Sequence, residues 1–174
     1  MTNAAYLNIG AQAAGTGTVD GVGSEVTGAG LTVGQAATGL LTLSNGGKVT
    51  ASNFTTIGQT GGTGTLNIVS GGKLSVGNYM NVGWDQGTGI TTVSGAGSRI
   101  DVVDHIALGV DTGTGTSKGT MTVTDGAVVK TPQLIVGFGV AGQGTLNIGA
   151  GGAAGTIDGM IRLVGASALV NFNH

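Results

Sequence analysis

Residues 65–89 read TLNIVSGGKLSVGNYMNVGWDQGTG, and the preceding residues 40–64 read LLTLSNGGKVTASNFTTIGQTGGTG. Each stretch holds three short segments in which apolar and polar side chains alternate, and glycine-rich corners separate the segments. Alternation over four to six residues rich in Val, Ile, Leu and Thr is typical of half-buried strands, and the 3.6-residue spacing of a helix is missing. The two stretches therefore predict successive coils with three strands each.

The same unit recurs along the chain, and a glycine closes its third segment each time. These glycines follow one another at steps of 24 to 28 residues. They occur in Ile9-Gly10, Val33-Gly34, Ile57-Gly58, Val82-Gly83, Leu108-Gly109, Val136-Gly137 and Val164-Gly165. A period in this range indicates a solenoid. We predict an all-β fold, a parallel β-helix of about seven coils of roughly 25 residues, forming a single domain over residues 1–174.

The alternation also predicts which side chains fill the interior. The first segment contributes Leu41/Leu43, Leu66/Ile68, Met121/Val123 and Leu146/Ile148; the second contributes Leu74/Val76 and Ile100/Val102; the third contributes Leu31/Val33, Met80/Val82, Ile106/Leu108 and Leu134/Val136. At about 4.8 Å per coil, the stack would form a rod of roughly 30–35 Å.

The composition excludes several classes of protein. Glycine accounts for 38 of the 174 residues and charged residues for only 8%, yet 40% are hydrophobic and sit at fixed places, so a packed core is expected. The six basic residues look scattered along the chain, which argues against nucleic-acid binding. No apolar run is long enough to span a bilayer, and the first residues, MTNAA, lack the features of a signal peptide. Either the chain stays inside the cell or it is a piece of a longer protein, and we expect a fragment of a longer repeat protein.

Four phrases carry a resemblance to a known family: GTGTLNIVSGGKLSVGN (62–78), GTGITTVSGAGSRIDV (87–102), KGTMTVTDGAVV (118–129) and GQGTLNIGAGG (142–152). They resemble the repeats of autotransporter (type V secretion) passenger domains and of PEP-CTERM-associated repeat proteins of bacterial surfaces. The resemblance implies a right-handed β-helix that is exported and either displayed on the cell or shed. It implies an adhesive or spacer stalk, with any enzymatic activity in separate inserted domains.

The expected function is thus a non-catalytic, extracellular stalk or adhesin-type module without cofactor, metal site or catalytic residues. Its expected partners are further copies of itself, associating end to end or laterally, or glycans of a host or cell surface. Self-association is expected because neither end of the repeat array shows a capping helix or a charged lid.

Two columns of side chains lie beside the third segment. Asn53, Asn78 and Asp104 each stand five residues before a closing glycine, which predicts a structural amide ladder. Phe54, Tyr79 and His105 form the next column, and cross-strand packing is the simpler interpretation. If these rings face outward, they could form, with Trp84 nearby, a strip on which sugars stack.

Asp85 and Asp111 each lie two residues beyond a closing glycine in adjacent coils. Carboxylates about 5 Å apart would suit calcium or acid–base chemistry, whereas the simpler interpretation is two solvated loop residues. Asp111 belongs to the longest corner, Gly109 to Gly119, which we interpret as an enlarged and flexible loop.

Threonine dominates the outward positions of the first segment. One column holds Thr16, Leu40, Thr65, Ile90, Thr120 and Thr145, and the other holds Thr18, Thr42, Asn67, Thr92, Thr122 and Asn147. A flat face of this kind suits an ice-binding β-solenoid, although threonine also favours strands and stacks well on itself. A polysaccharide-binding or polysaccharide-cleaving β-helix is a further alternative. It would require acidic and basic residues to gather on one face.

Overall fold

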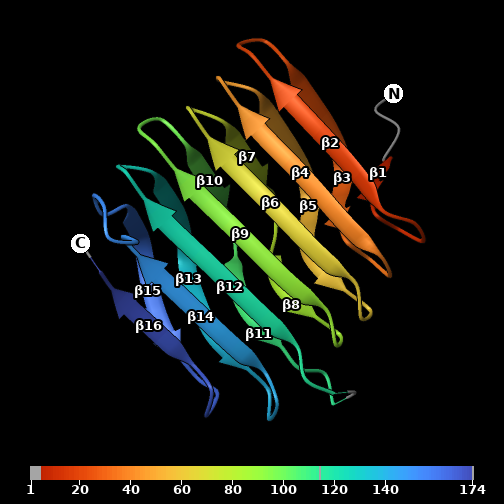
Figure 1. Cartoon of the computed structure of the whole chain (residues 1–174), viewed down its shortest axis with the longest axis vertical. Coiled ribbons are helices and arrows are strands. Elements are labelled where there is room, and N and C mark those ends of the chain that lie inside the picture. The colour runs from red at the N-terminus through yellow and green to blue at the C-terminus, as the bar shows by residue number, and fades with distance from the viewer. Residues whose placement is uncertain (1–4, 114, 174) are drawn as a thin grey trace.

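The computed structural model describes residues 5–113 and 115–173, and its regular elements in these ranges are β-strands throughout. The chain winds as a right-handed parallel β-helix of about seven turns, which confirms the predicted fold. The strands stack side by side from the N-terminal to the C-terminal end (Figure 1).

One side of the helix is a seven-stranded parallel sheet, which we call the first sheet. Its strands follow one another in chain order. They are β2 (Gly15–Asp20), β4 (Thr38–Ser44), β6 (Thr63–Val69), β9 (Thr88–Ser94), β12 (Lys118–Thr124), β14 (Gln143–Ile148) and β16 (Leu169–Phe172).

The remaining nine strands form one sheet that bends into two faces. They are β1 (Tyr6–Ile9), β3 (Glu25–Val33), β5 (Lys48–Gln59), β7 (Lys73–Val76), β8 (Met80–Trp84), β10 (Arg99–Val102), β11 (His105–Val110), β13 (Val128–Phe138) and β15 (Thr156–Leu163). The second face contains β7, β10 and the first halves of the long strands, and the third face contains β1, β8, β11 and their second halves.

The long strands refine the prediction of three strands per coil. Separate second and third strands occur in the coils of β7–β8 and β10–β11, whereas β3, β5, β13 and β15 each run through both faces. In β3 and β13 the pairing register shifts at the bend, between Gly28 and Gly30 and between Lys130 and Gln133. A bulge of this kind lets one strand turn the corner without a loop.

The interior holds the apolar pairs that the alternation predicts. Leu66, Ile68, Leu74, Met80 and Val82 are fully buried, and so are their counterparts in most other coils. Burying one such side chain contributes roughly 1.5–3 kcal/mol. Two threonines, Thr55 and Thr91, interrupt these apolar columns.

The closing glycines have a structural reason. Gly58 adopts φ +73°, a left-handed conformation that favours glycine, and a Cβ atom there would collide with the carbonyl of Thr88 in the next coil. Gly83 combines the same conformation with the same collision against Lys118. The repeating glycine therefore lets the backbone turn from the third face into the next strand of the first sheet.

Candidate functional site

Aromatic rings form a continuous column on the outer surface of the third face. Tyr79 stacks on Phe54 with ring centroids 6.0 Å apart and on His105 with centroids 5.8 Å apart. Tyr6 extends the column to Phe54 at 5.8 Å. It reaches across Gly30, where a Cβ atom would lie only 2.8 Å from the Phe54 ring. The sequence prediction missed Tyr6, and the glycine that aligns with both rings is the signal that identifies it.

The three rings lie nearly parallel along the column. The planes of Tyr79 and its two neighbours are only 15° and 16° from parallel. Trp84 lies apart from the column and packs against Ala107, Val110 and Ile135 near the other end of the strands. Phe54, Tyr79 and His105 thus form a wall of stacked rings, and Trp84 stands outside this wall beside an apolar cluster.

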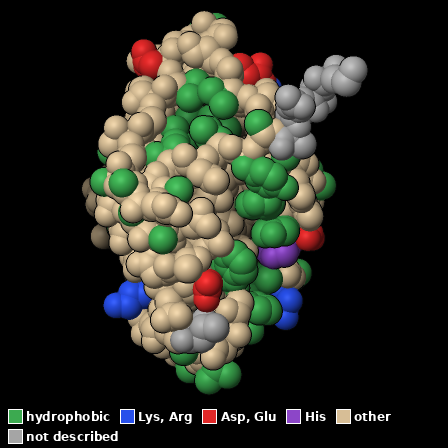
Figure 2. Space-filling model, turned by 90° about the vertical axis from the view of Figure 1, so that its right-hand side faces the viewer, with side chains coloured by type: hydrophobic (Ala, Val, Ile, Leu, Met, Phe, Trp, Pro, Cys, Tyr) green, Lys and Arg blue, Asp and Glu red, His purple; other side chains and the backbone are tan. Residues whose placement is uncertain are grey.

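A shallow groove of about 210 Å³, which we call the apolar trough, lies between these two features. Tyr79 and His105 form one side, and Val110 and Phe138 form the other. Asn81, Ala107 and Ile135 lie between them on β8, β11 and β13. Figure 2 shows hydrophobic side chains gathered in a strip beside the histidine.

The amide column next to the aromatic wall is only partly a ladder. Asn78 Nδ2 donates a hydrogen bond to Asn53 Oδ1 at 3.3 Å. The carboxylate of Asp104 instead lies 3.0 Å from His105 Nδ1, and the coils are joined at this point by the backbone N–H of Asp104, which donates to the Asn78 carbonyl. The acidic side chain thus orients the imidazole at the edge of the apolar trough.

The second face collects charge that looks scattered in the sequence. Lys48, Lys73 and Arg99 align in one column, and Asp101, Lys130 and Asp158 align in the next. We call this surface, together with Glu25, the ionic face. It holds four of the six basic residues of the chain, so the interpretation of scattered basic residues is wrong.

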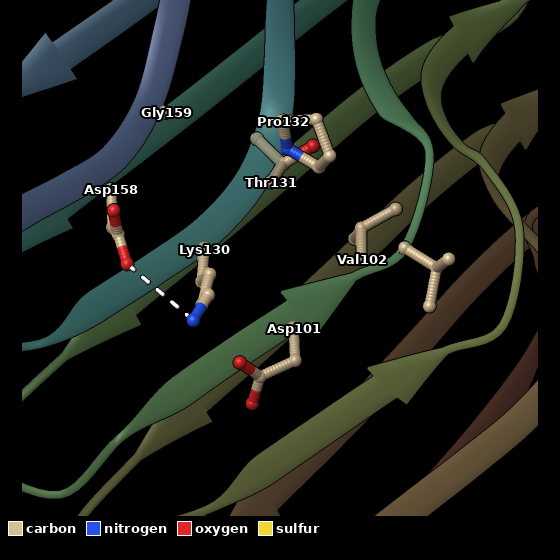
Figure 3. A pocket seen from close by; sticks show the side chains of 8 residues that line it. Asp101, Val102, Lys130, Thr131, Pro132, Asp158 and Gly159 are labelled. Carbon is tan, nitrogen blue, oxygen red and sulfur yellow. Dashed lines mark ion pairs between the residues drawn. The ribbon is translucent and has the colours of Figure 1, made fainter.

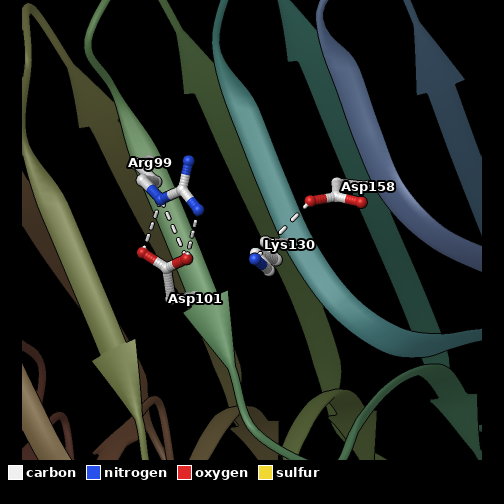
Figure 4. A network of polar contacts seen from close by, with 4 residues as sticks. All are labelled: Arg99, Asp101, Lys130 and Asp158. Atoms are coloured by element: carbon white, nitrogen blue, oxygen red, sulfur yellow. Dashed lines mark hydrogen bonds and ion pairs between the residues drawn. The ribbon is translucent and has the colours of Figure 1, made fainter.

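Most of these charges are paired with one another. Lys48 Nζ lies 3.0 Å from Glu25, and the hydrogen bond and charge of Lys48 lower the pKa of this carboxyl. Arg99 binds Asp101 through its Nε and a terminal nitrogen at 2.6 Å, which raises the pKa of the guanidinium. Lys130 and Asp158 make a longer pair at 3.9 Å (Figure 4).

A larger cleft of about 420 Å³ lies at the bend between the second and third faces. Asp101, Lys130, Thr131, Pro132 and Asp158 line it, and Lys130 points toward Asp158 across it (Figure 3). Pro132 stands where β13 shifts register, a position that proline tolerates because no ladder hydrogen bond is needed there. The sequence prediction missed this cleft, although the single proline of the chain marks its place.

The two predicted threonine columns are in register on the outer surface of the first sheet. Thr92 aligns with Thr122 and Thr18 with Thr42, while Ile90 stands beside Thr120. At the C-terminal end the second column forms hydrogen bonds between coils. Asn147 Nδ2 donates to Thr122 Oγ1 at 3.2 Å, and Asn171 Nδ2 donates to Asn147 Oδ1 at 2.8 Å.

Asp85 and Asp111 stand in aligned positions but use their carboxylates differently. Asp85 accepts a hydrogen bond from Thr60 Oγ1 at 3.4 Å. The nearly buried Asp111 accepts backbone hydrogen bonds from Ala141 at 2.9 Å and Gly113 at 2.7 Å, and these bonds lower its pKa. Among the described residues, no group of three or more His, Cys, Asp or Glu side chains is placed to hold a metal ion.

Within residues 5–113 and 115–173, no helix is long and apolar enough to cross a membrane. Comparison with protein-family models, with curated proteins and with solved structures finds no match to this chain.

Proposed function

We propose that the chain is a non-catalytic structural module, an extracellular stalk of adhesin type from a bacterial surface or secreted protein. The observation that carries this proposal is the pairing of the first sheet, which runs without a shift of register from β2 to β16. Such a rod holds its outer side chains at fixed spacing, as a surface for contact requires. The extracellular location rests on the resemblance of the repeats to passenger domains.

The use of the charged side chains supports a structural role. Asp20 accepts hydrogen bonds from Ser44 and Asn45 of the next coil, and Asp125 accepts one from Ser94 of the preceding coil. Together with the Lys48–Glu25 and Lys130–Asp158 pairs on the ionic face, these contacts tie one coil to its neighbour. Such carboxylates stabilise the stacking of coils in the rod.

Self-association is the partner we propose first. The last coil exposes Leu163, Leu169 and Phe172 at 58, 50 and 66% of their surface. The outer edges of β15 and β16 pair with no strand in the described part of the chain. Unpaired strand edges beside apolar side chains favour addition of another chain.

The competing function, polysaccharide cleavage, gains one supporting observation, because the ionic face borders the 420 Å³ cleft. Incubation with a panel of acidic polysaccharides distinguishes the two. We expect the polymers to keep their length, as measured by size-exclusion chromatography. Shortening of any polymer that Lys130→Ala abolishes would overturn the non-catalytic proposal.

Ice binding is a second candidate, favoured by the aligned threonine columns of the first sheet. An ice-recrystallisation assay tests it, since Thr92→Lys and Thr122→Lys would place bulky charges in the middle of the flat surface. Thr50→Lys on the second face is the matched control. Ice binding is excluded if the unchanged protein does not inhibit ice recrystallisation, or if both lysine variants inhibit it as well as the unchanged protein does.

A further inference from the structure

We infer that the apolar trough on the third face is a binding site for a short stretch of an uncharged, linear glycan. The inference rests on the proposed adhesive function and names the ligand class of one surface. The trough crosses three consecutive strands, β8, β11 and β13, and so runs along the axis of the rod. A chain-like ligand laid along this axis crosses the aligned positions Asn81, Ala107 and Ile135 in three successive coils.

The chemistry of the trough selects the ligand class. Ala107, Val110 and Ile135, which are nearly buried, form an apolar floor beside the half-exposed Phe138, and no Lys, Arg, Asp or Glu of the described residues lines the trough. A pyranose ring has an apolar face of C–H groups and a rim of hydroxyls, so it matches an apolar surface edged by polar groups. Arg162 of β15 aligns with Ile135 but lies one strand beyond the lining residues, so an anionic polymer would find no cation among the described residues that line the trough.

Polar groups at its edges are placed for hydroxyls. Tyr79 contributes a phenol, Asn81 an amide and His105 an imidazole, and all three line the trough. The Asp104 carboxylate lies against Nδ1 of His105, which leaves Nε2 as the nitrogen available to a ligand. A purely aliphatic ligand would bury these groups without hydrogen bonds, and that cost disfavours it. A few oriented polar groups in an apolar recess are typical of ligand sites.

The length of the trough predicts how affinity depends on the ligand. Three strands about 4.8 Å apart span roughly 10 Å, and each sugar unit of an extended glucan advances by about one strand spacing. We expect affinity to rise from the monosaccharide to the trisaccharide and then to level off.

The single tryptophan provides the measurement, because Trp84 packs against Ala107, Val110 and Ile135 at the trough. The probes are uncharged glucose oligomers, β-1,4-linked and α-1,4-linked, from monosaccharide to hexasaccharide. We expect a saturable change of Trp84 fluorescence with one series. The matched variants are Tyr79→Ala and Phe54→Ala, since each removes one ring of the same stack but only Tyr79 lines the trough.

Tyr79→Ala should weaken binding at least about tenfold, and Phe54→Ala should change it less than about twofold. Phe138→Ala, at a half-exposed position on the opposite side, should weaken binding without loss of folding, as circular dichroism checks. Equal losses in Tyr79→Ala and Phe54→Ala would overturn the inference. The inference would also be overturned if Trp84 fluorescence changed only with acidic polymers, with phosphatidylcholine vesicles or with protein concentration. It would likewise be overturned if no oligomer changed the fluorescence. In each of those cases the proposed structural function stands, whereas shortened oligomers in mass spectra would refute that function and leave glycan binding intact.

Discussion

Replacing Thr91 by valine should make the protein more stable. The Thr91 side chain is fully buried in the first sheet between Leu66 and Met121, and its hydroxyl has no hydrogen-bond partner among the described residues. A buried hydroxyl without a partner costs about 1–3 kcal/mol, and valine has nearly the same shape without this group. Thr91→Val should therefore raise the free energy of unfolding by about 1–3 kcal/mol.

Urea denaturation followed by circular dichroism measures the effect. With a denaturant slope of about 2 kcal/mol per molar, the midpoint should rise by roughly 0.5–1.5 M. Thr55→Val on the third face should act in the same direction, because the Thr55 hydroxyl is also buried and has no partner within the described part of the chain.

Thr131→Val is the matched control. Thr131 is just as buried, but its hydroxyl donates a hydrogen bond to the Gln133 carbonyl at 3.0 Å. Thr131→Val should lower the free energy of unfolding by about 0.5–1.5 kcal/mol, because it removes this hydrogen bond from the Gln133 carbonyl. If Thr91→Val lowers the midpoint as Thr131→Val does, the reasoning about the unpartnered hydroxyl is refuted.

Three further predictions concern the corners, the acid response and the last coil. Gly58→Ala should destabilise the protein by well over 2 kcal/mol, because it adds a collision to the cost of a left-handed residue. Gly61 has nearly the same φ but open space around it, so Gly61→Ala should cost only about 1–2 kcal/mol in the same denaturation assay. The pKa of Asp111 is lowered in the folded protein, so the ionised carboxylate stabilises the fold above the ordinary carboxyl pKa of about 3.9. This stabilisation is lost as the pH falls through the folded pKa. Denaturation midpoints measured from pH 7 downward should therefore fall less steeply in Asp111→Asn than in the unchanged protein. Phe172→Glu should shift light scattering toward the monomer, whereas Phe138→Glu, on the third face rather than the last coil, should not; unchanged association in Phe172→Glu would contradict the proposed end-to-end contact.

The periodicity of the sequence was sufficient for the fold because each coil repeats the same local rules. Alternation placed Leu66 and Ile68 inside, and the spacing of glycines such as Gly58 and Gly83 located the turns where only glycine fits. The joining of the second and third strands escaped prediction, since the sequence marks the corner, as at Gly28–Gly30, but does not show that one strand continues through it.

The candidate site was only partly predictable for a different reason. The column of Phe54, Tyr79 and His105 follows from counting back from the closing glycines, but the ring planes and the position of Trp84 depend on packing. The ionic face was missed because charges about 25 residues apart in the chain come into register only when coils are stacked. Counting outward positions in every coil, as for the threonine columns, would have found it.

The inward and outward positions of the coils are thus under different constraints. Inward positions repeat Leu, Ile and Val in nearly every coil because each must fill the same cross-section, so they carry little that distinguishes one coil from another. Outward positions are free of that constraint, and here they differ by face: threonine on the first, charge on the second, aromatic and apolar groups on the third. Ala107 and Ile135 are the clearest example, since they lie at outward positions apart from the main core and yet are nearly buried in a second apolar cluster with Trp84, beside a row of stacked rings. Because packing of the main core does not determine which residues stand at these outward positions, the apolar trough is the place to look for function.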